Sequence, residues 1–504
     1  MYSRLALALV AVLAIGAADR ALAKPVAGKQ SVDTPPPEHC SKRIRQSINW
    51  GVATAAYQIE GAWNESGRTP SVWDTLVHTP GNVKNNDTGD VACDHYHKYK
   101  QDFRLMKEMG IKNYRFSFSW SRILPEGGRG SAVSAEGIAF YNDLIDEMLL
   151  NDIAPAATMF HWDLPQVLHD KYHGPLSDEF VEDFVNYADV LFENFGDRVK
   201  YWMTFNEPLM TCDASYGFGK FAPAFKGGHV ALYSCAHHVL LAHATTSRLA
   251  KDKYRKQRAK VGIALNVEWA EPMTSSAEDK AAAQRNLDIQ FGLFADPLFL
   301  GKYPDLLRAK FGDAARELTP EQSKLVKGSL DFIGINHYTS RFVKANGNPL
   351  GFATSVWGSD GKEIGPVAQS NWLRVFPDGL YKITQYVTQR YGRPEIFITE
   401  NGVSVPGEND KPRDEAVRDG FRVNFFKDYL GALCRSKRDG ARVGAYFAWS
   451  FMDNFEWLQG YSERFGITYV DFASPNKERT VKDSGRYLSE HFFKANVASM
   501  RRRI

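Results

Sequence analysis

Eight short apolar segments, separated by helical patterns, constrain the fold of this chain more than any other feature of its sequence. Each is rich in β-branched, aromatic or small apolar residues and is bounded by polar residues, glycine or proline, which is typical of strands. The segments are Ile48–Tyr57, Ile111–Phe118, Ile153–Trp162, Val199–Asn206, Lys260–Val267, Asp331–Tyr338, Glu395–Glu400 and Arg442–Ser450. Strands that are apolar throughout predict a parallel sheet that is buried on both faces.

Helical patterns occupy much of the sequence between these segments. Apolar residues recur every three or four positions in Ala135–Leu150, in Asp178–Phe195 behind Ser177 as a predicted N-cap, and in Glu415–Arg435 after Pro412. Eight strands alternating with helices favour a closed barrel over an open doubly wound sheet. The predicted fold class is therefore α/β, a single (β/α)8 TIM barrel. The roughly 55 residues per unit leave room for long loops on the C-terminal face, where this fold carries its active sites.

The N-terminus has the pattern of a secretory signal peptide. Arg4 precedes an uncharged run, Leu5–Ala18, and then the small-residue cleavage pattern Ala21-Leu22-Ala23. We predict a signal peptide over residues 1–23, a flexible Pro-rich lead-in over 24–46 and the barrel domain over 47–498. The alternative is an apolar N-terminal anchor that is retained. No later segment is long and apolar enough to span a membrane, so a secreted protein with no membrane attachment after signal removal is expected.

Net charge, cysteine content and glycosylation sequons give further expectations about the protein. The 504 residues include 62 basic and 59 acidic side chains, a net charge of +3, which gives no footprint for nucleic acid. Five cysteines leave at least one unpaired in the monomer, and their connectivity does not follow from sequence. Two N-glycosylation sequons begin at Asn64 and Asn86, of which Asn86 is the better candidate.

No cofactor or metal is implied by the sequence. There is no P-loop, dinucleotide fingerprint or metalloprotease helix. Two clusters of histidines are interpreted as structural, because neither has an acidic ligand placed as in a metal site. The clusters are His95 with His97, and His237 with His238 and His243.

Two glutamates end two different predicted strands and would meet at the same rim of the barrel. Glu207 follows Asn206, and Glu400 precedes Asn401. A carboxylate that follows an apolar strand is costly to bury without a function. Paired carboxyls about 5 Å apart are the apparatus of glycoside cleavage, in which one holds a proton and the other attacks the anomeric carbon. Arg115, in the second predicted strand, would point into this rim and keep the nucleophile ionised.

An ordered set of motifs after about Ile48 resembles glycoside hydrolase family 1, the β-glucosidase family. The matching segments are residues 51–61, 67–74, 114–123, 160–165, 204–208, 336–338, 398–402, 449–457 and 464–466. The resemblance implies that Glu207 is the acid/base, that Glu400 is the nucleophile and that Asn206 binds the sugar 2-hydroxyl. It also implies that Tyr338 forms a hydrogen bond to the nucleophile. The resemblance assigns further residues to the sugar pocket and its surroundings: Gln58, His161, Trp449, Glu456 and Trp457 in the glycone pocket, Phe465 in its wall, and Trp372 at the aglycone.

The resemblance implies a retaining β-glucosidase that acts on small β-glycosides or oligosaccharides through a covalent glycosyl-enzyme. Glu207 stands where the myrosinases of this family have Gln, and no Lys follows Trp457 within the phosphate-binding segment of the 6-phospho-β-glycosidases. Both features favour hydrolysis of an unphosphorylated O-glucoside. A transglucosidase with the same site and a non-catalytic sugar-binding relative are the alternatives. The oligomeric state and the aglycone do not follow from the sequence.

Overall fold

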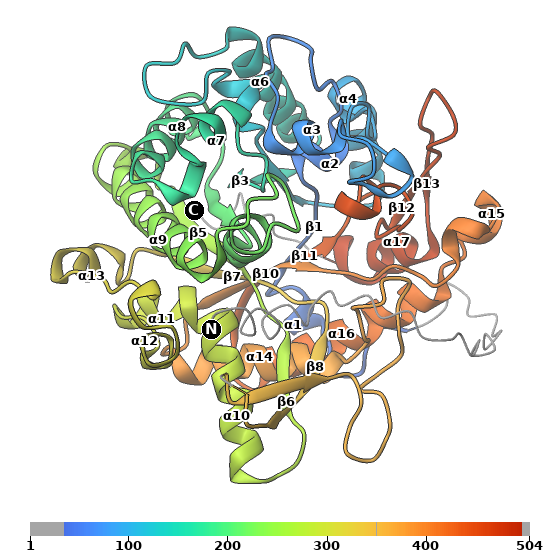
Figure 1. The fold of residues 1–504 in the computed structure, drawn as a ribbon. Coiled ribbons are helices and arrows are strands. Elements are labelled where there is room, and N and C mark those ends of the chain that lie inside the picture. Colours follow the sequence, from blue (N-terminus) through green and yellow to red (C-terminus); the bar gives the residue numbers. More distant parts are fainter. Residues whose placement is uncertain (1–34, 349, 496–504) are drawn as a thin grey trace.

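Eight parallel strands close into a barrel at the centre of the computed structural model, which describes residues 35–348 and 350–495 (Figure 1). Around the barrel the strand order is β1-β11-β10-β7-β5-β4-β3-β2, so successive barrel strands pair and the first, β1, closes the barrel against the last, β11. The barrel strands are β1 (Asn49–Ala53), β2 (Asn113–Ser117), β3 (Ala154–Phe160), β4 (Tyr201–Asn206), β5 (Lys260–Asn266), β7 (Phe332–Asn336), β10 (Glu395–Asn401) and β11 (Arg442–Trp449). Seven predicted segments contain a complete barrel strand, and the segment Glu395–Glu400 contains all of β10 except its last residue, Asn401. The (β/α)8 prediction is confirmed.

The barrel strands are buried on both faces, as their near-continuous apolar sequence predicts. All five residues of β1, β2 and β7 are buried, and so are all seven of β3. Small residues let the strands approach one another. A Cβ atom at Gly51, for example, would lie 2.3 Å from the carbonyl oxygen of Asn113 on β2. The parallel pairing directs the C-terminal ends of all eight strands to one rim.

Helices surround the barrel, and several short ones lie in the loops between strand and helix (Figure 1). The α-helices are α1 (Lys42–Arg45), α2 (Ala56–Ile59), α3 (Val72–Val77), α4 (His95–Glu108), α5 (Trp120–Ile123), α6 (Ala135–Leu150), α7 (Gln166–Tyr172), α8 (Glu179–Phe195), α9 (Gly228–Asp252), α10 (Ala277–Leu287), α11 (Leu293–Leu300), α12 (Asp305–Phe311), α13 (Pro320–Val326), α14 (Pro377–Arg390), α15 (Arg413–Ala416), α16 (Gly420–Arg438) and α17 (Asp483–Leu488). Two small sheets lie outside the barrel, β6 (Trp269–Pro272), β8 (Ser340–Ala345) and β9 (Phe352–Ser355) in one and β12 (Thr468–Val470) and β13 (Arg479–Val481) in the other.

The predicted helices agree with the structure except at two points. Helix α6 has the predicted bounds, whereas α8 has Asp178 rather than Ser177 as its N-cap. The single helix predicted over Glu415–Arg435 is wrong, because the chain forms α15 and α16 with a break over residues 417–419. The Asp419 carboxylate accepts hydrogen bonds from the backbone N–H and the hydroxyl of Ser484, which hold it outside the helix. Aspartate is a poor interior helix residue, and Asp419 is the N-cap of α16, which begins at Gly420.

Two disulfides cross-link the described residues, with sequence separations of 394 and 23. Cys40 pairs with Cys434 on α16, and Cys212 pairs with Cys235 on α9, while Cys93 is a buried free thiol. The first bridge and helix α1 attach part of the predicted lead-in, residues 24–46, to the barrel. The folded part of the chain therefore begins before residue 47. The predicted signal peptide lies outside the described residues.

No helix in residues 35–348 and 350–495 combines the length and apolarity needed to cross a membrane.

Candidate active site

Both candidate glutamates lie at the C-terminal rim of the barrel, and both are buried. Glu207 directly follows β4 and is 8% exposed, and Glu400 lies in β10 and is 4% exposed. Glu207 has a φ of 45°, in the left-handed region that non-glycine residues rarely adopt. Backbone strain of this kind is retained where the surrounding structure enforces it, and it is concentrated at functional sites.

The Glu400 carboxylate is held by two donors, one on each oxygen. Arg115 Nη1 lies 2.6 Å from Oε1, and the Tyr338 hydroxyl donates to Oε2 over 2.7 Å. The Arg115 side chain is fully buried, so its ion pair with Glu400 is shielded from water. A direct guanidinium partner stabilises the ionised form of a carboxyl. The arrangement gives Glu400 the properties of a nucleophile.

Glu207 lies in a different electrostatic environment. Burial raises the pKa of its carboxyl to about 8, and the nearby charge of Glu400 adds to the rise. A hydrogen bond of 2.8 Å from Asn336 Nδ2 to Glu207 Oε1 opposes this rise but does not cancel it. Glu207 therefore carries a proton at neutral pH and can donate it, as a general acid must.

A chain of amides connects the two glutamates. Asn206 Oδ1 accepts from Arg115 Nη2 at 2.7 Å and from Asn336 Nδ2 at 3.0 Å. Asn336 in turn is oriented by the Thr399 hydroxyl, which donates to its Oδ1 over 2.6 Å. Asn336 begins one of the matching motifs, but the sequence alone indicated no role for it. The available signal was its position, since it is the last residue of β7, at the same rim.

His161 completes this polar chain on the sugar side. Burial, and then the charge of Arg115, lower the pKa of His161 well below its usual range, so the ring is neutral. Its Nε2 accepts from Asn206 Nδ2 at 3.0 Å. Its Nδ1 is buried and has no hydrogen-bond partner within the described part of the chain. That nitrogen is available to donate to a bound hydroxyl group.

Aromatic rings stack in the predicted glycone pocket. The His161 ring lies nearly parallel to Trp449, at 5.8 Å and 15°, and to Trp457, at 6.0 Å and 14°. Trp449 is the last residue of β11, and Trp457 follows in the next loop with a φ of 50°. Flat apolar faces of this kind suit the C–H surface of a pyranose ring.

Gln58 and Glu456 present polar atoms that no described protein group satisfies. Gln58 lies in α2, and its Nε2 donates to Asn454 Oδ1 and to the Phe455 carbonyl, so only its buried Oε1 remains unpaired. Gln58 therefore presents a single free acceptor to a bound hydroxyl group. Glu456 Oε2 is likewise buried and without a partner among residues 35–348 and 350–495.

The pKa of the Glu456 carboxyl is strongly raised. Burial raises its pKa well above the usual range, and the carboxylates of Glu463, Glu400 and Glu207 add to the rise. A protonated carboxyl can both donate and accept a hydrogen bond, which suits sugar hydroxyls. Glu463 was not identified from the sequence, because its proximity to Glu456 arises from the loop after β11.

The remaining predicted residues lie around Tyr338. Its ring packs edge-on against Phe465, with centroids 6.2 Å apart, and against Trp372 at 5.8 Å. The structure thus brings the predicted site residues from seven barrel strands and the loops that follow them to one rim.

The histidines interpreted as structural have protein partners. His238 Nδ1 bonds the Pro175 carbonyl at 2.8 Å, and His243 Nδ1 lies 2.7 Å from the Thr204 hydroxyl. His95 Nδ1 pairs with Asp102 at 2.8 Å. In the described residues no group of three or more His, Cys, Asp or Glu side chains is arranged to hold a metal.

Two differently held carboxyls at the rim of a (β/α)8 barrel, beside stacked aromatic rings, define the class of this protein as a glycoside hydrolase. The family model of glycosyl hydrolase family 1 matches residues 40–496. The chain belongs to glycosyl hydrolase family 1.

Several characterised relatives are similar along most of their length. β-Glucosidase 4 of Oryza sativa subsp. japonica is 43% identical over 460 residues, which cover 89% of this chain and 94% of the relative. The structure of a family 1 β-glucosidase from the fungus Humicola insolens, in complex with glucose, has a TM-score of 0.86 at 41% identity and covers 89% of this chain and 98% of its own. A rice β-glucosidase mutant in a covalent complex with Glc has a TM-score of 0.86 at 40% identity, with the same coverage.

Proposed function

We propose that this protein is a secreted, retaining β-glucosidase that cleaves terminal β-D-glucosyl residues by double displacement. The observation that carries the proposal is the difference between the two carboxyl environments. Arg115 and Tyr338 stabilise negative charge on Glu400, whereas burial and the charge of Glu400 keep a proton on Glu207. Retaining glycosidases need this pair of states before the first step.

In the first step Glu400 attacks the anomeric carbon while Glu207 protonates the departing glycosidic oxygen. The bond to the aglycone breaks, and a bond from the carboxylate oxygen of Glu400 to the sugar forms. Loss of negative charge on Glu400 lowers the pKa of Glu207, which has just released its proton. In the second step Glu207 accepts a proton from water, and the water oxygen displaces Glu400 with a second inversion.

The pocket supports glucose as the glycone. Asn206 presents its amide beside Glu400, where it can bond the 2-hydroxyl, and His161, Gln58 and Glu456 have buried polar atoms available for the other hydroxyls. By family resemblance Glu456 takes the 4- and 6-hydroxyls. The glucosidase names of the relatives agree with this assignment.

The configuration of the first-formed sugar tests the mechanism. Proton NMR of an early time point with a β-glucoside should show β-glucose first, with α-glucose appearing only by mutarotation. Initial formation of α-glucose would contradict double displacement by Glu400.

Secretion is the second part of the proposal. The N-terminal segment has the features of a signal peptide, and disulfides such as Cys40–Cys434 and Cys212–Cys235 form and persist in oxidising compartments. The sequon residues Asn64 and Asn86 are both exposed. Mass spectrometry of the protein from a culture medium should give a mature N-terminus near Lys24. An intact N-terminus on cell-retained protein would contradict it.

A further inference from the structure

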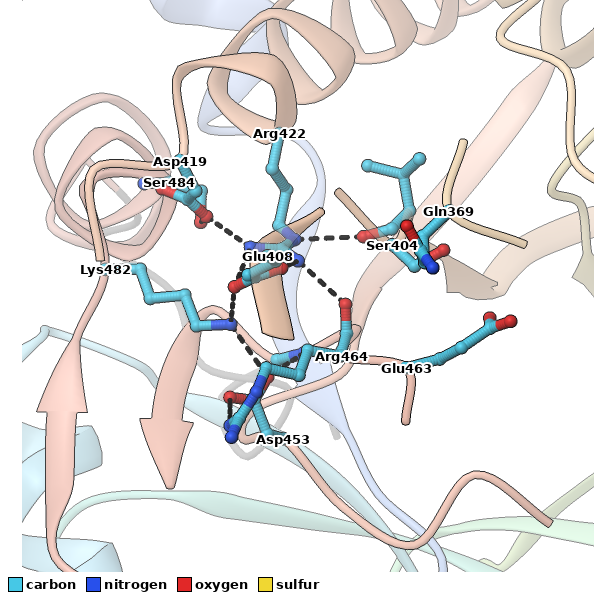
Figure 2. Close-up of polar contacts among 12 residues, drawn as sticks. Gln369, Ser404, Glu408, Asp419, Arg422, Asp453, Glu463, Arg464, Lys482 and Ser484 are labelled. Carbon is cyan, nitrogen blue, oxygen red and sulfur yellow. Dashed lines mark hydrogen bonds and ion pairs between the residues drawn. The ribbon is translucent and has the colours of Figure 1, made fainter. Parts of the chain in front are cut away.

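Six charged side chains form a buried network behind the glycone pocket, and three of them are cations and three are anions (Figure 2). We call this set the ion network. Its side chains are at most 3% exposed except for one arginine at 10%. Its members are Glu408, Asp419, Arg422, Asp453, Arg464 and Lys482.

The network connects four segments of the C-terminal part of the chain. Glu408 lies in the loop after β10, Arg422 lies in α16, Asp453 lies in the loop after β11, and Lys482 precedes α17. Lys482 Nζ bridges Glu408 and Asp453, at 2.5 and 2.7 Å. Arg422 binds Glu408 at 2.6 Å. Lys482 is therefore the cation that joins the two loops.

The same side chains also hold the backbone on both sides of the sugar pocket. Arg422 Nε donates to the Val403 carbonyl at 2.9 Å, three residues after Glu400. Arg422 Nη2 donates to the Arg464 carbonyl at 2.8 Å, directly before Phe465. The contact between Arg422 and Arg464 is visible near the centre of Figure 2.

Asp453 closes the loop that carries Glu456. Its Oδ1 accepts from the Gly466 backbone N–H at 3.0 Å, and its Oδ2 binds Arg464 at 2.7 Å. Its own N–H donates to the Thr468 carbonyl at 2.9 Å. The loop from Asp453 to Gly466 is thus tied at its base, and Glu456 and Phe465 both lie within it.

The three cations of the network oppose the cost of burying the Asp453 carboxylate. Burial acts to raise the pKa of Asp453, but the three network cations together bring it below the usual value. Removing one partner from a buried ion pair leaves an uncompensated charge, which is strongly unfavourable and is relieved by moving the groups toward water. Any such movement would carry the Glu456 loop with it.

We propose that Lys482 is a positioning residue, which acts through Asp453 and Glu408 to fix the Glu456 loop relative to Glu400 and so sets the preference for glycones with a 6-hydroxymethyl group. Lys482 is fully buried between the two carboxylates and acts through them. This inference rests on the proposed function, in which Glu456 binds the 4- and 6-hydroxyls.

The test compares kcat/KM for two substrates with the same leaving group, p-nitrophenyl β-glucoside and p-nitrophenyl β-xyloside. The xyloside lacks only the 6-hydroxymethyl group. The ratio of the two values is independent of the fraction of active enzyme, so it can be measured on a variant that folds poorly. Since one lost contact of this kind is worth about tenfold, we expect Lys482→Met to lower the glucoside-to-xyloside ratio roughly fivefold or more.

Glu408→Gln is measured in parallel, because it removes a charge of the opposite sign from the same bridge while keeping the side-chain shape. If positioning is the cause, both variants lower the glucoside-to-xyloside ratio. The apparent pKa values of the two limbs of the kcat/KM profile then stay within a few tenths of a unit of those of the unsubstituted protein. Limbs that shift in opposite directions in the two variants would overturn the proposal, because they would indicate a long-range charge effect on the catalytic pair.

Arg390→Met is the matched control. Arg390 binds buried Asp296 at 2.7 Å, but it ends α14 just before β10 begins, at the opposite end of the barrel from the site. It should lower the thermal midpoint without changing the substrate ratio. A ratio unchanged in Lys482→Met, or changed equally in Arg390→Met, would overturn the proposal.

Glu456→Gln separates this inference from the proposed function. If it lowers the ratio while Lys482→Met does not, the sugar-binding role of Glu456 stands and the positioning role of Lys482 is wrong. If Glu456→Gln leaves the ratio unchanged, both are wrong.

Discussion

The catalytic cluster and the ion network are both buried and charged, but they differ in the balance of their charges. The catalytic cluster comprises Glu207, Glu400, Glu456 and Arg115, three carboxyls and one guanidinium. The ion network has three of each sign. In the cluster, burial and mutual repulsion raise the pKa of the two carboxyls that Arg115 does not bind directly.

The comparison indicates what each arrangement can do. A balanced set of buried charges holds backbone segments in place, because its side chains form hydrogen bonds to the backbone of several segments. An unbalanced set holds protons that it can exchange with a substrate. The same physical terms, desolvation and Coulomb interaction, therefore give structure in one region and acid–base chemistry a few residues away.

The largest effect is expected from removing the ionised member of the catalytic cluster. Glu400→Ala should reduce kcat for β-glucosides by roughly 10⁴-fold or more, because the covalent intermediate cannot form. Azide added to this variant should yield the α-glucosyl azide. A β-azide product, identified by NMR, would show that Glu400 is not the nucleophile.

Removing the protonated member should give a smaller and substrate-dependent loss. Glu207→Ala should lower kcat by roughly 10²- to 10⁴-fold for poor leaving groups and much less for activated ones. Azide should accelerate this variant and give the β-glucosyl azide, since Glu400 still forms the intermediate. Equal losses for good and poor leaving groups in steady-state kinetics would contradict the acid/base role.

The sequence predicted the barrel and the position of the two candidate glutamates at its rim, because both depend on local patterns. Strand periodicity marked the eight segments, and strand ends marked Glu207 and Glu400. Motif resemblance added Tyr338 and Trp449, which lie next to the same ends.

The features that the sequence did not predict depend on contacts between distant segments. Lys482 lies 74 residues from Glu408, and the pairing of Cys40 with Cys434 spans 394 residues. The helix break at Asp419 depends on Ser484, which no local propensity reveals. Asn336 and Glu463 matter through neighbours that only the closed barrel supplies.

The raised pKa of Glu207 predicts a pH-dependent cost to folding. Its folded value, about 8, exceeds the unfolded value, so the folded state binds more protons between these values and loses stability as pH rises through this range. Glu207→Gln removes the titration while keeping an acceptor for Asn336. At pH 8 we expect it to increase the free energy of unfolding by about 2 kcal/mol and therefore to raise the thermal midpoint by several degrees. At pH 4 it should change the midpoint little. A midpoint difference that does not depend on pH would contradict a protonated Glu207.

The smallest effect should come from an exposed ion pair, which calibrates the ion network. Arg248 and Asp252 pair on α9 at 3.2 Å with side chains 71% and 66% exposed. Arg248→Ala should change the free energy of unfolding by less than about 0.5 kcal/mol, since water screens the pair and its ordering costs entropy. Lys482→Met, which strands two buried carboxylates, should cost about 3 kcal/mol or more. The thermal midpoints of both variants, measured at low and high salt, check this prediction. Only the effect of Arg248→Ala should depend on the salt concentration. Comparable losses of stability in the two variants would mean that burial does not strengthen the ion pairs of the network.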